Sequence, residues 1–260
     1  MIDCHFHVRA DDHSTPEKRA EYADWVRSET EALGIETVCG MMGFAAFADS
    51  VAEARRKNGH MAKYVEEYPD LFHGWARINP AWGEPGVEEF RRAVEEDGLM
   101  GLKLYADVYV DDPQLDPYAE AAVDMDVPII HHVSGRRDHV ERPETPSFIT
   151  EESRTEHVAR RAERSPDLDL IAAHIGGGGD WEHRIKNLVA HDSVYLDISG
   201  TNCDAGMVEM AVESLGADRC VFGTDNWLLP CVGKLRGADV TDDQRETIAY
   251  RMRDIIEGTA

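Results

Sequence analysis

The segment MIDCHFHV, residues 1–8, is a short apolar run that reads as a β-strand and ends in two histidines, His5 and His7. In a strand, residues i and i+2 point to the same face, so both imidazoles are expected on one side. No glycine-rich phosphate loop follows, as it would after the first strand of an open doubly wound sheet. At the C-terminal end of a barrel strand, the two histidines would instead face the mouth, where barrel enzymes carry their active sites.

Beyond this segment, apolar β-branched runs alternate with longer amphipathic segments. Eight runs are predicted as strands: Ile2–His5, Glu36–Met41, Phe72–Ile78, Gly101–Leu104, Pro128–His132, Leu168–His174, Val194–Ile198 and Cys220–Gly223. Eight segments are predicted as helices: Pro16–Leu33, Phe47–Tyr68, Val87–Glu96, Pro117–Asp124, Thr150–Arg164, Trp181–His191, Met207–Leu215 and Asp242–Ile255. Thr15, Ser153 and Thr241 carry the residue types that start helices. Strict alternation predicts an α/β fold, a (β/α)8 TIM-like barrel formed by residues 1–260 as a single domain.

Potential metal ligands recur where later predicted strands end. His131 and His132 end the fifth strand, His174 ends the sixth, and Asp225 follows the eighth. A barrel brings these strand ends together, although they are far apart in the sequence. Histidines and an aspartate that converge from four strands are what a divalent metal site with a nearby base requires.

Six short motifs occur in a particular order along the chain: MIDCHFH, GLKLY, PIIHHVSG, AAHIGGG, VYLDISG and VFGTDNW. This ordered set resembles the amidohydrolase superfamily. It is most similar to the amidohydrolase-related branch that contains aminocarboxymuconate-semialdehyde decarboxylase, resorcylate decarboxylases and pyrone-dicarboxylate lactonase. The resemblance covers essentially the whole chain.

The resemblance implies which residues hold the metal: His5, His7, His132 and Asp225. It favours His132 over His131 because the family places this ligand four residues after a proline such as Pro128. His131 would then point outward or into packing, since neighbouring strand residues face opposite sides. The same resemblance implies that His174 and Asp225 are catalytic, His174 acting on substrate or metal-bound water and Asp225 as proton acceptor.

Lys103 lies where two-metal amidohydrolases carry a carboxylated lysine that bridges the ions. In the branch that the chain resembles, one metal is usual and this lysine is not normally a bridge. One divalent ion is therefore expected, Zn²⁺ first, with Mn²⁺, Mg²⁺ or Fe²⁺ as alternatives, and a bridged pair remains the competing arrangement. Lys103 itself is expected near the mouth, satisfied by a carboxylate such as Asp107 or Asp225.

Candidate substrate-binding residues surround these positions. They are Arg136, Arg137, Tyr105, Trp227 and Lys103. Arg77 and Asn79, at the end of the third predicted strand, are further candidates for contact with the substrate. The long segment 134–149 contains a cluster of basic residues, which is unusual in this acidic chain. Its arginines would suit a carboxylate substrate. Pairing with nearby acids is the alternative role for the arginines, and packing is the alternative for the two aromatic residues.

These residues favour a metal-dependent hydrolase that acts on an ester, lactone or amide of a small, carboxylate-bearing substrate. The ion would lower the pKa of a bound water and polarise the carbonyl. The alternative is a non-oxidative decarboxylase of an aromatic or unsaturated acid, which uses the same ligand set. A metal-dependent deoxyribonuclease is disfavoured because that group carries a glutamate at the position of Lys103. A non-catalytic barrel is disfavoured because every expected ligand position is filled.

The chain is strongly acidic, with 51 Asp and Glu against 27 Lys and Arg and a net charge of −24. Such a surface repels nucleic acid and anionic membranes, and we interpret it as an adaptation to high salt, as in a halophile. Because no secretory signal or membrane span is apparent, a cytoplasmic protein is expected. Small molecules are the expected partners, and the resemblance to the family adds a homodimer.

Overall fold

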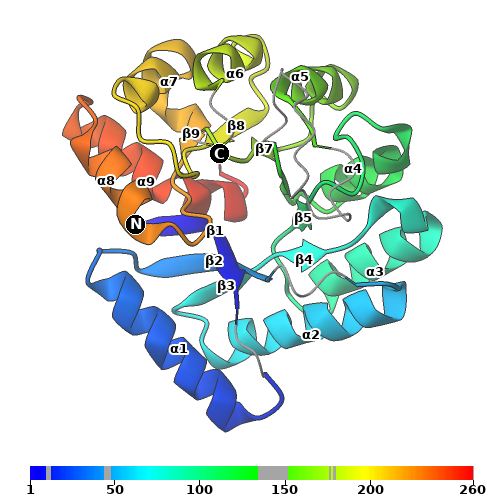
Figure 1. The fold of residues 1–260 in the computed structure, drawn as a ribbon. Helices are drawn as coiled ribbons and strands as arrows, with labels where there is room; N and C mark the ends of the chain where they lie inside the picture. Colours follow the sequence, from blue (N-terminus) through cyan, green and yellow to red (C-terminus); the bar gives the residue numbers. More distant parts are fainter. Residues whose placement is uncertain (10–12, 44–47, 134–151, 176, 178–179, 260) are drawn as a thin grey trace, which may run out of the picture.

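The computed structural model describes residues 1–9, 13–43, 48–133, 152–175, 177 and 180–259. Its strands are all parallel and follow one another around the molecule in sequence order. They are β1 (Ile2–Val8), β2 (Thr37–Met42), β3 (Phe72–Gly74), β4 (Ala76–Arg77), β5 (Leu102–Leu104), β6 (Ile129–His131), β7 (Leu170–Ala172), β8 (Val194–Asp197) and β9 (Cys220–Val221). Figure 1 shows them at the centre of a ring of helices.

Two breaks in the strand list are bridged by backbone hydrogen bonds. β3 and β4 form one strand interrupted at Trp75, whose backbone N–H donates to Gly40 at 2.8 Å. β9 and β1 are joined where Cys4 N–H donates to Phe222 at 2.9 Å and Asp225 N–H to His5 at 2.8 Å. The sheet therefore closes on itself with eight strands, which confirms the predicted (β/α)8 barrel.

The helices are α1 (Pro16–Glu31), α2 (Val51–Glu67), α3 (Glu84–Glu95), α4 (Asp116–Asp124), α5 (Thr155–Arg164), α6 (Trp181–Leu188), α7 (Met207–Leu215), α8 (Leu228–Gly237) and α9 (Asp242–Ile256), with short 3₁₀ turns at Pro80–Trp82, Pro113–Leu115 and Ala217–Arg219. The helix α8 was not predicted. Thr15 and Thr241 cap α1 and α9 as expected. Ser153 does not cap α5; its hydroxyl accepts a hydrogen bond from Val110 N–H instead. None of the described helices is long and apolar enough to span a membrane.

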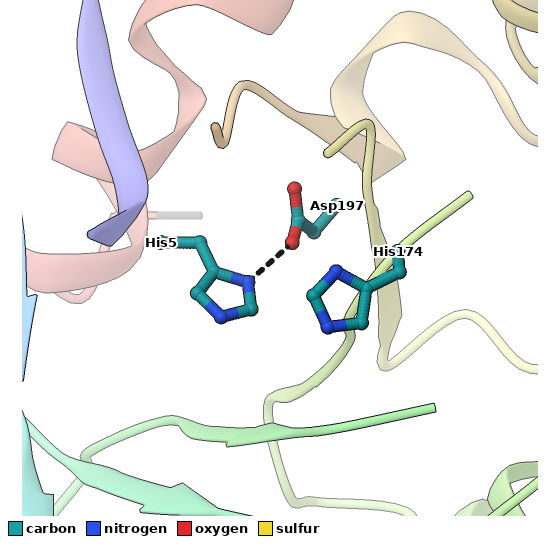
Figure 2. A group of neighbouring side chains, drawn as sticks. All are labelled: His5, His174 and Asp197. Atoms are coloured by element: carbon teal, nitrogen blue, oxygen red, sulfur yellow. Dashed lines mark hydrogen bonds and ion pairs between the residues drawn. The ribbon is translucent and has the colours of Figure 1, made fainter. Parts of the chain in front are cut away.

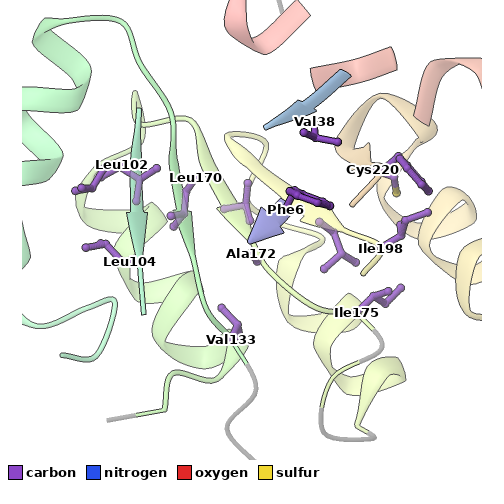
Figure 3. Packing of buried hydrophobic residues seen from close by; sticks show 14 of the residues in the cluster. Phe6, Val38, Leu102, Leu104, Val133, Leu170, Ala172, Ile175, Ile198 and Cys220 are labelled. Carbon is purple, nitrogen blue, oxygen red and sulfur yellow. The ribbon is translucent and has the colours of Figure 1, made fainter. Parts of the chain in front are cut away.

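Buried apolar side chains form two separate clusters on the two faces of the barrel wall. The larger cluster lies between strands and helices and includes Phe6, Val38 and Leu102 (Figure 3). The smaller one fills the barrel interior and includes Ile2, Cys4 and Cys39. The strand residues of the two clusters alternate along the chain, as a wall buried on both faces requires.

An irregularity in β1 sets the direction of the two histidines. The pairing with β2 passes from Asp3↔Val38 to Phe6↔Gly40, so β1 contains one extra residue there. This is a β-bulge, a feature that re-aims side chains beside active sites. Because of it, Cys4 and His5 both lie opposite Cys39 and both face the interior. His7 then also points inward.

Candidate active site

His5, His7 and Asp225 form a compact group at the C-terminal mouth of the barrel, here called the His–His–Asp group. Asp225 Oδ1 lies 3.0 Å from His7 Nε2 and 3.6 Å from His5 Nε2. The three ligand atoms all lie within 4.8 Å of one another. The structure therefore brings these three residues together from the first strand and the segment after the last.

The backbone that carries Asp225 is strained and tied to β1. Asp225 and the following Asn226 have φ angles of 51° and 64°, in the left-handed region that non-glycine residues rarely adopt. The Asn226 side chain accepts from His7 N–H at 2.7 Å and donates to the His7 carbonyl at 2.9 Å. These bonds fix Asp225 against the two histidines.

Asp225 is held as a carboxylate. Burial by itself would raise its pKa, but a hydrogen bond from His7 and the nearby His5, His7 and Lys103 outweigh burial and lower the pKa below its ordinary value. A carboxylate of low pKa is a good metal ligand and a weak base. This lowered pKa agrees better with the predicted role of metal ligand than with that of proton acceptor.

Asp197 is a member of the site that the sequence analysis did not single out. It ends β8, is fully buried, and accepts a hydrogen bond from His5 Nδ1 at 2.8 Å, with His174 on its other side (Figure 2). Burial raises its pKa to about 6, against hydrogen bonds from Ser199 that lower it. The available signal was an acidic residue at the end of a barrel strand, in the VYLDISG motif.

The proton positions on His5 follow from its two neighbours. Lys103 Nζ lies 2.9 Å from His5 Nε2, and an ammonium group can only donate. Nε2 must therefore carry the lone pair, and Nδ1 carries the proton that is donated to Asp197. A carboxylate that fixes a histidine in this way is the usual outer partner of a metal-ligating imidazole.

The same reasoning extends from Asp197 to a second pair of imidazoles. Ser199 donates its hydroxyl proton to Asp197 Oδ2 at 2.6 Å, so its oxygen accepts from His174 Nδ1 at 2.9 Å. His174 Nε2 is then an acceptor and receives the proton of His132 Nδ1, also at 2.9 Å. The Nε2 atom of His132 is thus unprotonated, in the form that binds metals or protons.

Burial keeps these imidazoles neutral. It lowers the pKa of His7 and His132, and lowers the pKa of His5 and His174 well below the ordinary histidine value. The charge of Lys103 acts in the same direction on all four. Neutral histidines are the form that coordinates a divalent ion, so the electrostatics suit a metal centre.

The structure separates His132 from the His–His–Asp group. Its ring lies 4.8 Å from that of His174 and 4.4 Å from that of Tyr105, centroid to centroid, and its Nε2 lies 3.9 Å from Glu152. Its predicted role as a fourth metal ligand remains a prediction. His131 faces the helices in register with Leu104, as the alternation predicted.

Lys103 lies in the barrel interior but does not form the predicted ion pair with a carboxylate. Among the residues that the structure describes, no carboxylate lies within ion-pairing distance of Lys103, so the expected pairing with Asp107 or Asp225 is wrong. Asp107 binds Arg77 instead, and the Lys103 ammonium bonds to His5. Burial lowers the pKa of Lys103 to about 8.

The remaining predicted substrate contacts fall in different places. Tyr105 is buried and lines a cavity together with His7, Lys103 and Arg77. Trp227 is half exposed and begins α8. Arg136 and Arg137 lie outside the described residues.

The donor set fits a resident metal ion. Two neutral imidazole nitrogens and a carboxylate oxygen converge from β1 and the segment after β9, and this mixture of ligands suits Zn²⁺, Mn²⁺ and Fe²⁺. Asp197 supplies the outer hydrogen bond that such a ligand needs. The chemistry of the residues therefore agrees with the divalent ion that the resemblance implied.

Comparison with known proteins shows the family to which the chain belongs. A family model described as amidohydrolase matches residues 2–247. The 2-amino-3-carboxymuconate-6-semialdehyde decarboxylase of Dictyostelium discoideum is 29% identical over 110 residues. That match spans 41% of this chain and 31% of the relative, so it covers about a third of the relative's length.

Solved structures resemble the whole chain. The 2,6-dihydroxybenzoate decarboxylase from Rhizobium superposes with a TM-score of 0.74 and 20% identity, covering 100% of this chain and 98% of the other. The dihydroxybenzoic acid decarboxylase from Polaromonas sp. JS666, solved with manganese and 2-nitroresorcinol, gives 0.72 and 21%, covering 100% and 96%. At these identities the likeness shows a common fold.

Proposed function

The chain belongs to the amidohydrolase family, and from this premise we propose that it is a metal-dependent, non-oxidative decarboxylase of a small aromatic or unsaturated carboxylic acid. The sequence analysis preferred hydrolysis and kept decarboxylation as the alternative. The relatives named above support the alternative, because all three carry decarboxylase names. The observation that carries the proposal is the convergence of the His–His–Asp group with a second, hydrogen-bonded pair of imidazoles at one mouth.

The His–His–Asp group would hold one divalent ion, with Mn²⁺ and Zn²⁺ as the two to test. When bound, such an ion supplies positive charge that orients an acidic substrate and stabilises negative charge in the transition state. Asp197 keeps the Nε2 lone pair of His5 directed into the mouth. Asn226 keeps the His7 backbone in place.

Decarboxylation replaces a carbon–carboxylate bond by a carbon–hydrogen bond. The electron pair of the broken bond stays on the substrate carbon, carbon dioxide leaves, and one proton must be delivered to that carbon. His132 can make this delivery once it is protonated: its Nε2 can take up a proton from solvent by way of Glu152, a partly exposed carboxyl group 3.9 Å away, and pass that proton to the carbon. Burial lowers the pKa of His132, so its imidazolium form gives up a proton readily.

Hydrolysis would make a different demand on the site. A proton acceptor would have to take a proton from the attacking water next to the ion. Asp225, the carboxylate in that position, has a lowered pKa and is a poor acceptor. His174 has both ring nitrogens engaged, one by Ser199 and one by His132. The two residues predicted as proton acceptors, Asp225 and His174, are therefore poorly suited to activate water.

The test is a substrate panel on metal-loaded protein. Candidate acids, including 2,6-dihydroxybenzoate and 2-amino-3-carboxymuconate-6-semialdehyde, are incubated with the protein, and carbon dioxide release is measured beside a parallel panel of lactones, esters and amides. We expect carbon dioxide release that requires added metal and is lost in His7→Ala. His191→Ala is the matched control, because His191 precedes β8 at the opposite end of the barrel. Metal-dependent hydrolysis without carbon dioxide release would overturn the proposal.

A further inference from the structure

Asp3 is a buried acid beside the His–His–Asp group that plays no part in the chemistry described so far. Its relative exposure is 0%, and it lies two residues before His5 on β1. Oδ1 accepts hydrogen bonds from the backbone N–H of His5 at 3.0 Å and from that of Thr224 at 2.9 Å. The Thr224 hydroxyl donates to Oδ2 at 2.5 Å. A polar group that is buried and hydrogen-bonded in this way makes the segments that it connects rigid.

One of these bonds lies inside the β-bulge of β1, where the pairing with β2 is interrupted. An interrupted ladder leaves backbone groups that need other partners. Oδ1 of Asp3 supplies an acceptor for the N–H of His5. On the other side, the indole N–H of Trp75 donates to the carbonyl of Cys4 at 3.0 Å. Side chains therefore satisfy backbone groups of the bulge that turns the two histidines inward.

The other two bonds connect Asp3 to the segment that carries Asp225. The Thr224 hydroxyl accepts from Asn226 N–H at 3.2 Å, and the Asn226 side chain binds the backbone of His7. Asp225 stands between Thr224 and Asn226 and has a left-handed φ of 51°. A residue keeps such a conformation only where the surrounding structure fixes it. Asp3 thus binds both segments that supply the His–His–Asp group.

The link between Asp3 and Thr224 does not depend on which of them is the donor. Burial raises the pKa of Asp3 to about 8, so the group can carry a proton at neutral pH. A protonated Oδ2 would donate to the Thr224 hydroxyl oxygen, which can accept two hydrogen bonds. Oδ1 accepts from the two backbone N–H groups in either state.

We propose, on the basis of the metal site in the function proposed above, that Asp3 is a positioning residue of the His–His–Asp group. It holds the bulge of β1 and the segment after β9 in the relative arrangement that one metal ion requires. Ligands from two segments share an ion only when their distances to it are correct to about 0.2 Å. Asp3 acts through the backbones of His5 and Thr224 and through the Thr224 hydroxyl, and it is not a ligand itself.

Two substitutions separate the acceptor of Asp3 from its charge. Asp3→Asn keeps Oδ1 for both N–H groups and places an NH₂ group against the Thr224 hydroxyl, as protonated Asp3 would. Its affinity for Mn²⁺ should stay within about threefold of wild type, whereas loss of a partner that orients a ligand costs about 10–100-fold. Asp3→Ala removes all three bonds and should weaken Mn²⁺ binding about tenfold or more.

The matched control is Glu89→Ala. Glu89 is also a buried acid, with a side-chain exposure of 3%, but it lies on α3 and binds Arg92 at 2.7 Å. Its loss should lower the free energy of unfolding and leave the affinity for Mn²⁺ unchanged. If Asp3 were merely structural, folded Asp3→Ala would behave in the same way.

The deciding experiment is a Mn²⁺ titration followed by the electron paramagnetic resonance of the free ion, under conditions in which circular dichroism shows each variant to be folded. If Asp3→Ala does not fold, Thr224→Val replaces it, because valine has nearly the same shape and keeps the backbone N–H. Thr224→Val should weaken Mn²⁺ binding about fivefold, as for one lost hydrogen bond, and Thr224→Ser should restore it.

A second measurement reports the geometry without metal. His7 Nε2 lies 3.0 Å from Asp225 Oδ1, so the ¹⁵N signals of the His7 ring depend on where Asp225 is held. In metal-free protein, Asp3→Ala, or Thr224→Val in its place, should move these signals toward those of Asp225→Ala. Glu89→Ala should leave them unchanged.

Three outcomes overturn the inference: wild-type Mn²⁺ affinity in folded Asp3→Ala or its replacement, an equal loss of affinity in Asp3→Asn and Asp3→Ala, or unchanged His7 signals. Failure of the proposed function gives different results. Asp3-dependent Mn²⁺ binding in a protein that releases no carbon dioxide from any acid would support the positioning role while the decarboxylase proposal fails. If the wild type binds no Mn²⁺, the metal site of the proposed function fails, and the His7 signals alone decide the role of Asp3.

Discussion

Replacing Asp197 by asparagine is expected to reverse the hydrogen bonds that connect His5 with His132. Every group around the Asp197 carboxylate is a donor: His5 Nδ1 at 2.8 Å, the Ser199 hydroxyl at 2.6 Å and the Ser199 backbone N–H at 2.7 Å. An asparagine must place its NH₂ group against some of these donors. The backbone N–H cannot change its role, whereas an imidazole can change tautomer and a hydroxyl can rotate.

The NH₂ group will therefore take the position of Oδ2 and donate to His5 Nδ1 and to Ser199 Oγ. His5 must then carry its proton on Nε2, where it opposes the Lys103 ammonium 2.9 Å away and turns a donor toward the other members of the His–His–Asp group. Ser199 must donate to His174 Nδ1, which moves the proton of His174 to Nε2 and that of His132 to its own Nε2. Loss of an outer-shell partner typically lowers metal affinity by 10–100-fold, or about 1.4–2.8 kcal/mol. We expect the upper end, since two ligand candidates change tautomer at once.

The assay is a competition titration of Mn²⁺ or Zn²⁺ against a chromogenic chelator, combined with ¹⁵N NMR of the histidine rings in metal-free protein. Ser199→Ala should interrupt the chain at His174 but leave the His5 tautomer and most of the metal affinity intact. Asp192→Asn, at a fully exposed carboxylate, controls for the loss of one negative charge. Metal affinity within about twofold of wild type in Asp197→Asn, or an unchanged His5 tautomer, would refute the reasoning.

Three further outcomes are expected from the structure. His7→Ala should lose most bound metal in plasma mass spectrometry while its far-ultraviolet circular dichroism stays unchanged; full metal content would exclude His7 as a ligand. Burial lowers the pKa of His131 to about 3, so the unfolded chain binds a proton below pH 6.5 that the folded chain does not, and stability present at neutral pH is lost as the pH falls. This histidine alone should lower the free energy of unfolding by about 1.4 kcal/mol at pH 5.5, so the loss measured in urea titrations should be smaller by that amount in His131→Phe than in wild type. Trp75→Phe should cost about 1–3 kcal/mol, because the Cys4 carbonyl loses the indole N–H that lies at 3.0 Å; an unchanged urea midpoint would contradict this.

Much of the site could be predicted from the residues at the ends of the predicted strands. His5, His7 and Asp225 were predicted from their positions at the ends of the first and last strands, and the closed barrel brings them together. Asp197 was missed although, like Asp225, it stands at the end of a predicted strand. Its role depends on His5, which is 192 residues away in the sequence.

The failure to predict helix α8 has a physical origin. The helix α8, LLPCVGKLRG, contains a proline and two glycines and lies close behind the last strand, so its sequence reads as a loop. Tertiary contacts hold it in place: Lys234 donates to the carbonyls of Ile198 and Gly200 at the end of β8. Packing of this kind overrides weak local propensity.

The sequence by itself determined the alternation of strands and helices, hence the barrel, and the fact that His5 and His7 share one face. It did not determine which face. Ile2 and Cys4 face the interior, so uninterrupted alternation would have turned both histidines toward the helices. The bulge between Asp3 and Phe6 shifts the alternation by one residue and turns both histidines inward, in a strand that pairs with β2 on one side and with the segments around β9 on the other. Side-chain periodicity is a local property of the chain, whereas strand register is fixed only by the neighbouring strands, and for that reason tertiary structure decided where the imidazoles point.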